Sequence, residues 1–133
     1  MTRVTLAGLP DLITRYKSRV DAVVKQSAHD VAAVAQTPVA KGGRMPVDTG
    51  FLRNSFSSTL MGGTALTGAD SYVLVAGQME AGQIASFGWT AEYARHVEYG
   101  TSRMRGFHFM AGAVDQWPSI VRGAVARAVR EIG

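Results

Sequence analysis

The chain has 133 residues, of which 47% are hydrophobic and 18% charged, a composition that indicates one globular domain rather than a disordered segment. The net charge is +4, and the absence of cysteine excludes disulfides, thiolate metal sites and a cysteine nucleophile. No apolar run has the length of a secretory signal or of a membrane span, so we expect a cytosolic protein without a membrane partner.

The first predicted element is a long helix from Pro10 to about Gln36. Its apolar residues recur at steps of three and four and form one stripe, which comprises Leu12, Ile13, Tyr16, Val20, Val23, Val24, Val31 and Val34. Pro10 suits the first helical turn, and the charge of Asp11 is favourable at the positive helix start. Because a residue that precedes proline disfavours helical geometry, the helix should end before Pro38.

A loop is predicted for residues 37–50, because TPVAKGGRMPVDTG holds two prolines and three glycines. The loop carries two basic residues, Lys41 and Arg44. We regard both as candidate contacts with a partner.

Three strand-like runs follow, at 55–60, 72–76 and 84–89. The middle run, YVLVA, is continuously apolar, as expected for a central strand. The glycine-rich connections between the runs are short enough for antiparallel pairing. We therefore expect a small antiparallel sheet of about three to four strands. The glycines at 62–63 lack the lysine and the GK[ST] frame of a phosphate-binding loop, which excludes that function.

The last third of the chain predicts two further helices. The first is short, covers residues 91–99 and is closed by Gly100 in the left-handed cap conformation. After a basic loop, the second begins at about Met110. Its apolar side comprises Val121, Ala124, Val125, Ala128, Val129 and Ile132, and its polar side comprises Arg122, Arg127 and Arg130. Pro118 either starts this helix or kinks it, so we expect a weak joint at 115–117.

Together these elements predict a single α+β domain over residues 1–133, along which the sign of the charge alternates. Residues 1–47 hold seven Lys/Arg and three Asp/Glu, a net charge of +4. Residues 48–100 hold two Lys/Arg and five Asp/Glu, a net charge of −3, and residues 101–133 hold five Lys/Arg and two Asp/Glu, a net charge of +3. A basic total is typical of nucleic-acid binding. The alternation fits equally well with copies of one subunit that meet basic end to acidic middle.

Residue types that catalyse reactions or bind metals are scattered along the chain. His29, His96 and His108 have no ligand partner at helical spacing, and neither an HExxH nor a DxD pattern occurs. Ser55 and Ser57 lack the GxSxG frame of a nucleophile elbow. We therefore predict a protein without catalytic residues, cofactor or metal.

The stretch MPVDTGFLRNSF predicts a helix cap and a turn that lead into the first strand. Asp48 or Thr49 can accept a backbone N–H from one turn later, and Gly50 avoids side-chain crowding at the turn. Leu52 and Phe56, four residues apart, are then carried to the apolar side of the chain.

The Asp-Thr-Gly triplet also occurs in aspartic proteases, which offers an alternative interpretation. That class expects the triplet among strands, in a much longer chain or an obligate dimer, with a small residue after the glycine. This chain has Phe51 there. We therefore favour the turn.

Two segments carry a pattern that extends beyond local turn chemistry: PVDTGFLRNSF from Pro46 and WTAEYARHVEYGTSRMRGFHFM from Trp89. The matched residues of the first are Pro46, Asp48, Thr49, Gly50, Leu52, Arg53 and Ser55. Those of the second are Tyr93, Ala94, Val97, Glu98, Tyr99, Gly100, Thr101, Met104, Phe109 and Met110. In this order and spacing, the segments resemble the signature of the head–tail joining proteins of long-tailed double-stranded-DNA bacteriophages, also called neck or tail-completion proteins. The order of elements matches across nearly the whole chain.

The chain departs from the family's pattern near the last helix. The family usually has a proline just before the phenylalanine of the last segment, where this chain has Gly106-Phe107-His108. Pro118 inside the terminal helix is also atypical. Both differences bear on where that helix starts and whether it is straight.

The resemblance implies a structural role: a subunit of a ring between the connector of the DNA-filled head and the tail tube, without catalytic residues. Since tail tubes are six-fold, it implies a homo-oligomeric ring of six copies. Its partners would be head-closure or connector proteins, the tail terminator or tail tube protein, and the genomic DNA that passes through the lumen. The protein would occur in the virion neck and, during assembly, in the host cytoplasm.

We expect loops at 37–47, 61–70 and 101–108 to make the contacts of such a ring, because they combine length, glycine content and charge. Arg103 and Arg105 are the candidates for contacts with acidic neighbours or DNA phosphate.

Two acidic residues of the signature segments are expected to organise the backbone. Asp48 would cap a helix, and Glu98 would accept hydrogen bonds from loop N–H groups or an arginine.

Other functions stay open at the level of residues. A tail terminator or another minor tail ring protein fits the charge pattern equally well, and only the paired segments favour the joining protein. A small DNA-binding regulator would use Arg122, Arg127 and Arg130, although the outer face of any amphipathic helix is polar.

Overall fold

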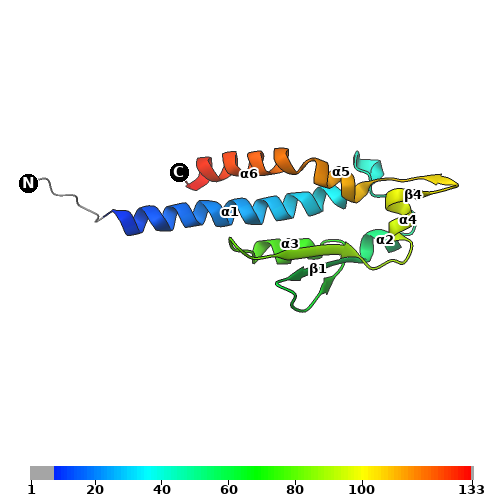
Figure 1. Cartoon of the computed structure of the whole chain (residues 1–133), viewed down its shortest axis with the longest axis horizontal. Coiled ribbons are helices and arrows are strands. Elements are labelled where there is room, and N and C mark those ends of the chain that lie inside the picture. Colours follow the sequence, from blue (N-terminus) through cyan, green and yellow to red (C-terminus); the bar gives the residue numbers. More distant parts are fainter. Residues whose placement is uncertain (1–7, 133) are drawn as a thin grey trace, which may run out of the picture.

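A computed structural model describes residues 8–132, and its longest element is α1 (Leu9–Ala35), which runs along most of the molecule (Figure 1). Pro10 lies in its first turn, and Gln36 caps its C-terminal end before Pro38. The predicted helix and its end before the proline are both confirmed. At its N-terminal end α1 extends past α6 and α3, and residues 10–18 are all exposed.

The other elements are short, apart from the last. In chain order they are η1 (Val39–Lys41), α2 (Phe51–Asn54), β1 (Phe56–Leu60), β2 (Leu66–Thr67), α3 (Ser71–Gly77), β3 (Ala85–Trp89), α4 (Ala94–Tyr99), β4 (Gly100–Thr101), β5 (Met104–Arg105), α5 (Phe109–Asp115) and α6 (Trp117–Ile132). This architecture confirms the predicted α+β class, with a long N-terminal helix, a small antiparallel sheet and a C-terminal helix.

β1 is the central strand of a three-stranded antiparallel sheet with the order β2-β1-β3. Its register pairs Phe56 with Trp89 at one end and Leu60 with Ala85 at the other. The first and third predicted strands are therefore confirmed. β2 forms inside the connection that the sequence predicts as a loop.

The predicted central strand at 72–76 is wrong, because this run belongs to the helix α3. Val75 and Ala76 are buried, whereas Val73 and Leu74 are 47% and 62% exposed. Exposure thus changes in adjacent pairs, as on a helix, and not at every second residue. An apolar run this short does not distinguish a strand from a helix by periodicity, and packing of α3 against α1 and β1 decides the outcome.

The C-terminal region forms two helices that are separated at Gln116. Pro118 is the second residue of α6, where its missing N–H costs little. It therefore starts α6 rather than kinking it, and the joint predicted at 115–117 is confirmed.

α6 lies antiparallel to α1 and packs against it (Figure 1). Of the predicted apolar side, only Ala124 and Ala128 are buried, while Val125 and Val129 are 44% and 53% exposed. The prediction that this side faces the core is therefore only partly right. Small side chains make the contact, and the larger valines lie at its margin.

Two hydrophobic clusters stand out in the core of residues 8–132. The first comprises Met45, Leu52, Ala91 and Phe109, with Trp89, Ala94 and Val97 packed against it. The second comprises Ala28, Ala76 and Met79, with Val24, Leu60, Ala85 and Phe87 packed against it. Phe56 is fully buried, and its ring centroid lies 5.1 Å from that of Trp89 and 5.7 Å from that of Phe87. This ring therefore links the two clusters.

Candidate docking site

The turn of the first signature segment is built around Gly50. This residue has φ +84° and is the N-cap of α2. Thr49 Oγ1 accepts a long hydrogen bond from the N–H of Phe51, at 3.4 Å. Asp48 is exposed, and among the described residues no side chain caps α2. The predicted capping role of Asp48 is wrong, because Gly50 occupies the cap and leaves Asp48 two residues before it.

Leu52 and Ser55 anchor this turn in the core. Leu52 is 5% exposed and belongs to the first hydrophobic cluster, as its spacing from the fully buried Phe56 predicts. Ser55 Oγ donates to the carbonyl of Leu52 at 2.7 Å. The carbonyl of Ser55 accepts the N–H of Thr90 at 3.0 Å, which ties the turn to the end of β3.

Glu98 connects the second signature segment to the start of α5. Its side chain is 3% exposed, and its two carboxylate oxygens accept the N–H groups of Met110 at 3.1 Å and Ala111 at 3.0 Å. A carboxylate is favoured here because the first N–H groups of a helix lack partners within the helix and carry partial positive charge. The prediction that Glu98 accepts backbone N–H groups is confirmed, although these groups belong to the first turn of α5 and not to a loop.

A hairpin of β4 and β5 follows directly after α4. Gly100 has the positive φ that the sequence predicts, +86°, but its ψ of 174° is not that of the left-handed cap. Its role is to allow close packing at the base of the hairpin. A Cβ on Gly100 would lie 2.6 Å from the nitrogen of Gly106, and a Cβ on Gly106 would lie 2.5 Å from the carbonyl oxygen of Glu98. The region predicted as a basic loop is thus partly a strand pair.

The two signature segments meet around one groove of about 380 Å³, which we call the signature groove. It is lined by Pro46, Asp48, Thr49, Gly50, Phe51, Leu52, Tyr93, Val97, Met104 and Phe107. The ring centroids of Phe51 and Tyr93 lie 6.0 Å apart. Phe51 is 62% exposed and Tyr93 is 42% exposed. Exposed aromatic and apolar side chains in a groove are typical of a surface that binds another protein.

The predicted basic contact residues fall into two groups. Arg103 and Arg105 are exposed on the β4–β5 hairpin, whose Met104 lines the signature groove, and Thr101 Oγ1 accepts the N–H of Arg103 at 3.2 Å.

Lys41 and Arg44 line a second pocket of about 250 Å³, beside α5. There the Arg44 side chain lies against Gly112, where an added Cβ would be 3.0 Å from its Cδ. The β4–β5 hairpin and α5, beside which the two groups lie, are at the end of the molecule away from the first turns of α1 (Figure 1).

Gln36 is an important residue of this end that the sequence does not indicate. It is 1% exposed, and its Nε2 donates to the carbonyls of Arg53 at 2.8 Å and Ala69 at 3.0 Å. Its Oε1 accepts Trp89 Nε1 at 2.8 Å, and its own carbonyl accepts Arg53 Nε at 2.9 Å. One amide therefore joins the end of α1 to α2, β3 and the segment before α3. A sequence does not show which backbone carbonyls will accept hydrogen bonds, so no pattern predicts this role of Gln36.

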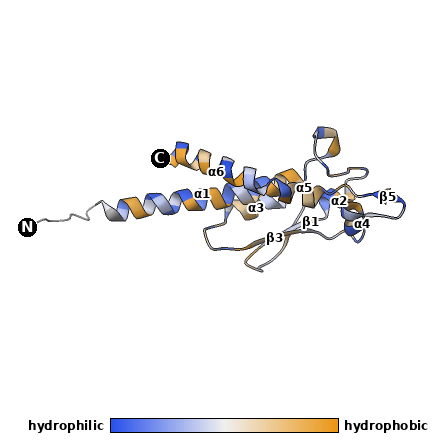
Figure 2. Cartoon of the chain, turned by 45° about the horizontal axis from the view of Figure 1, so that its top comes forward, coloured by the Kyte–Doolittle hydropathy of each residue, from blue (hydrophilic) through white to orange (hydrophobic). Residues whose placement is uncertain are grey.

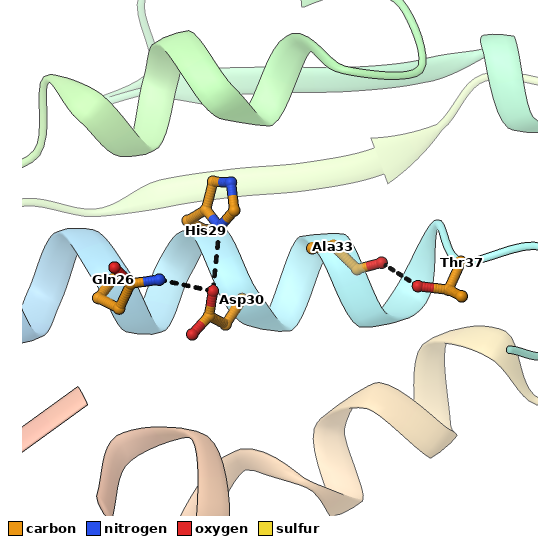
Figure 3. Close-up of polar contacts among 5 residues, drawn as sticks. All are labelled: Gln26, His29, Asp30, Ala33 and Thr37. Atoms are coloured by element: carbon orange, nitrogen blue, oxygen red, sulfur yellow. Dashed lines mark hydrogen bonds and ion pairs between the residues drawn. The ribbon is translucent and has the colours of Figure 1, made fainter. Parts of the chain in front are cut away.

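His29 makes a side-chain contact on α1. His29 Nδ1 lies 3.0 Å from Asp30 Oδ1, which also accepts Gln26 Nε2 at 2.7 Å, so His29 belongs to a polar cluster on α1 (Figure 3). Nearby, Thr37 Oγ1 donates to the carbonyl of Ala33 at 2.7 Å. Within residues 8–132, no group of three His, Asp or Glu side chains is placed to bind a metal ion.

None of the described helices combines the length and apolar character that crossing a membrane requires. No protein-family model, curated protein or solved structure matches this chain.

Proposed function

We propose that this chain is a structural subunit of a bacteriophage neck, which assembles into a ring of six copies between the head connector and the tail tube. The observation that carries the proposal is the signature groove. Two segments that resemble the joining-protein signature, and that lie far apart in the sequence, line one exposed apolar surface. A bipartite signature that converges on one surface is what a shared docking site requires.

The buried residues of the same segments support the proposal. Leu52 belongs to the first hydrophobic cluster, and Glu98 holds the start of α5. These residues fix the walls of the groove, while Phe51 and Tyr93 remain exposed within it. A rigid frame with exposed aromatic residues is favourable for binding, because little side-chain freedom is lost on contact.

The shape of the described chain also fits a subunit that binds its neighbours through different surfaces. The first turns of α1 project at one end, and the β4–β5 hairpin projects at the other (Figure 1). Contacts between two different surfaces of identical subunits generate closed rings when the rotation between subunits closes.

A charge reversal on the hairpin tests this proposal. We expect phage that carry Arg103→Glu and Arg105→Glu to accumulate full heads and finished tails that are not joined, as seen by negative-stain microscopy. Because both side chains are exposed, the purified variant should keep the melting temperature of the wild type.

Arg122→Glu with Arg127→Glu is the matched control, since these arginines are exposed on α6. The control phage should assemble normally. Joined virions at normal yield from the hairpin variant would show that its arginines are not contacts. Normal virions from a phage that lacks the protein altogether would contradict the neck function itself.

A gel-shift titration separates the proposal from a DNA-binding regulator. A neck subunit should bind DNA weakly, without sequence preference, and lose that binding as salt rises. Sequence-selective binding at physiological salt would favour the regulator.

A further inference from the structure

The first turns of α1, residues 10–18, form a projecting segment that we call the α1 arm. Its apolar residues Leu12, Ile13 and Tyr16 are 60%, 58% and 68% exposed. They continue the stripe that packs into the core further along the helix, where Val24 borders the second cluster. Figure 2 shows hydrophobic residues on these turns, which extend past the other elements. The arm belongs to a 27-residue helix whose later turns are packed in the core, and a partner surface that buries its apolar side chains would stabilise it further.

The charges of the α1 arm and the next turn indicate the chemistry of that surface. Asp11 pairs with Arg15 inside the arm, with 3.0 Å between the carboxylate and the guanidinium. Lys17 and Arg19 have no carboxylate partner within the described chain, whereas the carboxylate of Asp21 in the next turn accepts the N–H of Ala81 at 2.8 Å. The arm therefore calls for a surface that is both apolar and acidic.

The same chain offers exposed apolar side chains on α3, with an acidic residue before and after the helix. Residues 61–84 contain two carboxylates, Asp70 and Glu80, and no lysine or arginine. The two carboxylates flank α3 in the chain, and both are exposed. Val73 and Leu74, on α3 between them, are 47% and 62% exposed. We call these four residues the α3 face.

We infer that the α1 arm of one subunit lies on the α3 face of a second copy of this chain, as the contact between neighbours in the proposed ring. Tyr16 and its apolar neighbours pack against Val73 and Leu74, and Lys17 and Arg19 lie near the carboxylates of the α3 face. The inference rests on the proposed function for the ring. Two arms packed against each other would bring like charges together, which disfavours a symmetrical contact.

The absence of cysteine allows a direct test with single-cysteine variants. Tyr16→Cys and Leu74→Cys are each made in the otherwise wild-type chain, mixed in equal amounts and oxidised. Because each chain has one thiol, any disulfide joins two copies. Docking of the arm raises the effective concentration of the two thiols, so we expect roughly tenfold more mixed dimer than either homodimer. Non-reducing gels with tagged chains of different mass measure all three species.

Val129→Cys is the matched control, because Val129 is 53% exposed on α6 and lies outside the α3 face. Its mixed dimer with Tyr16→Cys should form only at the collisional level. Adding Lys17→Glu to the Tyr16→Cys chain should lower the yield of the 16–74 dimer. Adding Asp70→Lys and Glu80→Lys to the Leu74→Cys partner should restore it.

Two outcomes would overturn the contact: a 16–74 yield no higher than that of the 16–129 control, or a predominance of 16–16 dimers. A phage that lacks the protein tests the neck function separately. If its heads and tails stay unjoined, either cross-linking result contradicts the contact but not the neck function. Conversely, a trapped 16–74 dimer from a protein that is dispensable for joining would support self-association and contradict the neck function.

Discussion

Glu98 is a buried acid whose role follows from the geometry of one helix start. Its two oxygens occupy the place of an N-cap side chain for α5, while the chain's own N-cap residue, His108, has the left-handed conformation and makes no side-chain cap. The acid therefore links α4 to α5 and holds one wall of the signature groove in place.

Replacing Glu98 with alanine should lower the free energy of unfolding by about 2–3 kcal/mol, because two N–H groups at the buried helix start lose their acceptor. Glu98→Gln keeps one acceptor oxygen and should lose roughly half as much. Urea unfolding monitored by circular dichroism measures both. Equal stability of Glu98→Ala and the wild type would contradict the capping role.

Tyr72 makes the folding stability of the protein depend on pH in the alkaline range. Burial of the side chain, with a further contribution from the charge of Asp70, raises the pKa of Tyr72 above 10.0. The folded state therefore holds this proton more tightly than the unfolded state does. The stability from the neutral hydroxyl is fully present below pH 10.0 and is lost as pH rises through the folded pKa.

We expect Tyr72→Phe to flatten the decline of the unfolding free energy between about pH 9 and pH 11. Denaturant titrations of both chains across this range provide the comparison. A variant whose stability declines as steeply as that of the wild type would exclude Tyr72 as the source.

At the level of elements, the start of α2 shows how two local rules compete. An aspartate or threonine before a short helix is a good cap by type, and the sequence predicts Asp48 in that role. Glycine offers no side-chain acceptor but adopts positive φ without strain, and Gly50 takes the position. Which residue caps α2 depends on the backbone direction of the segment before it, and no local sequence pattern predicts that direction.

Gly50→Ala should therefore destabilise the protein by roughly 1–2 kcal/mol, because φ is +84° and the new Cβ would lie 3.3 Å from Asn54 Nδ2. Asp48→Ala should stay within about 0.5 kcal/mol of the wild type. Thermal melts of the two variants measure the order. The reverse order would restore Asp48 as the cap.

Other elements differ in how far local sequence determines them. α1 is predictable because 27 residues sustain one helical period between two prolines. α3 is not, since its short apolar run satisfies the requirements of a strand and of a helix alike, and only α1 and β1 select the helix. β2 is held by its pairing with β1 alone, which composition does not reveal.

Across the whole molecule, buried contacts are distributed unevenly along α1. The C-terminal part of the helix holds Ala28, Ala32 and Ala35, which are at most 7% exposed, whereas the α1 arm is exposed throughout. Local stability should follow the same gradient, since opening of a segment costs the contacts that it makes.

Amide hydrogen exchange of the monomer should therefore show little protection in residues 10–18 and the strongest protection in residues 28–36. Assembly should raise protection in the first range and leave the second unchanged. Uniform protection along α1 in the monomer would contradict this picture of the arm.

The candidate site as a whole was partly predictable. The signature segments include Tyr93 and the residues on both sides of Phe51, although not Phe51 itself. The four-residue spacing of Leu52 and Phe56 correctly predicts that both lie in the core. The contributions of Met104 and Phe107 to the groove depend on the fold of the β4–β5 hairpin over α4. The four-way role of Gln36 depends on carbonyls from Arg53 and Ala69 that have no side-chain signature.

The hydrogen bonds of Gln36 anchor the C-terminal end of α1, and this has a mechanical consequence. The helix is about 40 Å long at 1.5 Å per residue, so a tilt of about 5° about its C-terminal end moves its N-terminal end by about 3.5 Å. Gln36 and its three partners fix one end of α1, and packing against α3 and α6 fixes the direction of the helix. In the proposed ring, substitutions that tilt α1 would therefore change where the α1 arm reaches, and with it the diameter at which the subunits close a circle.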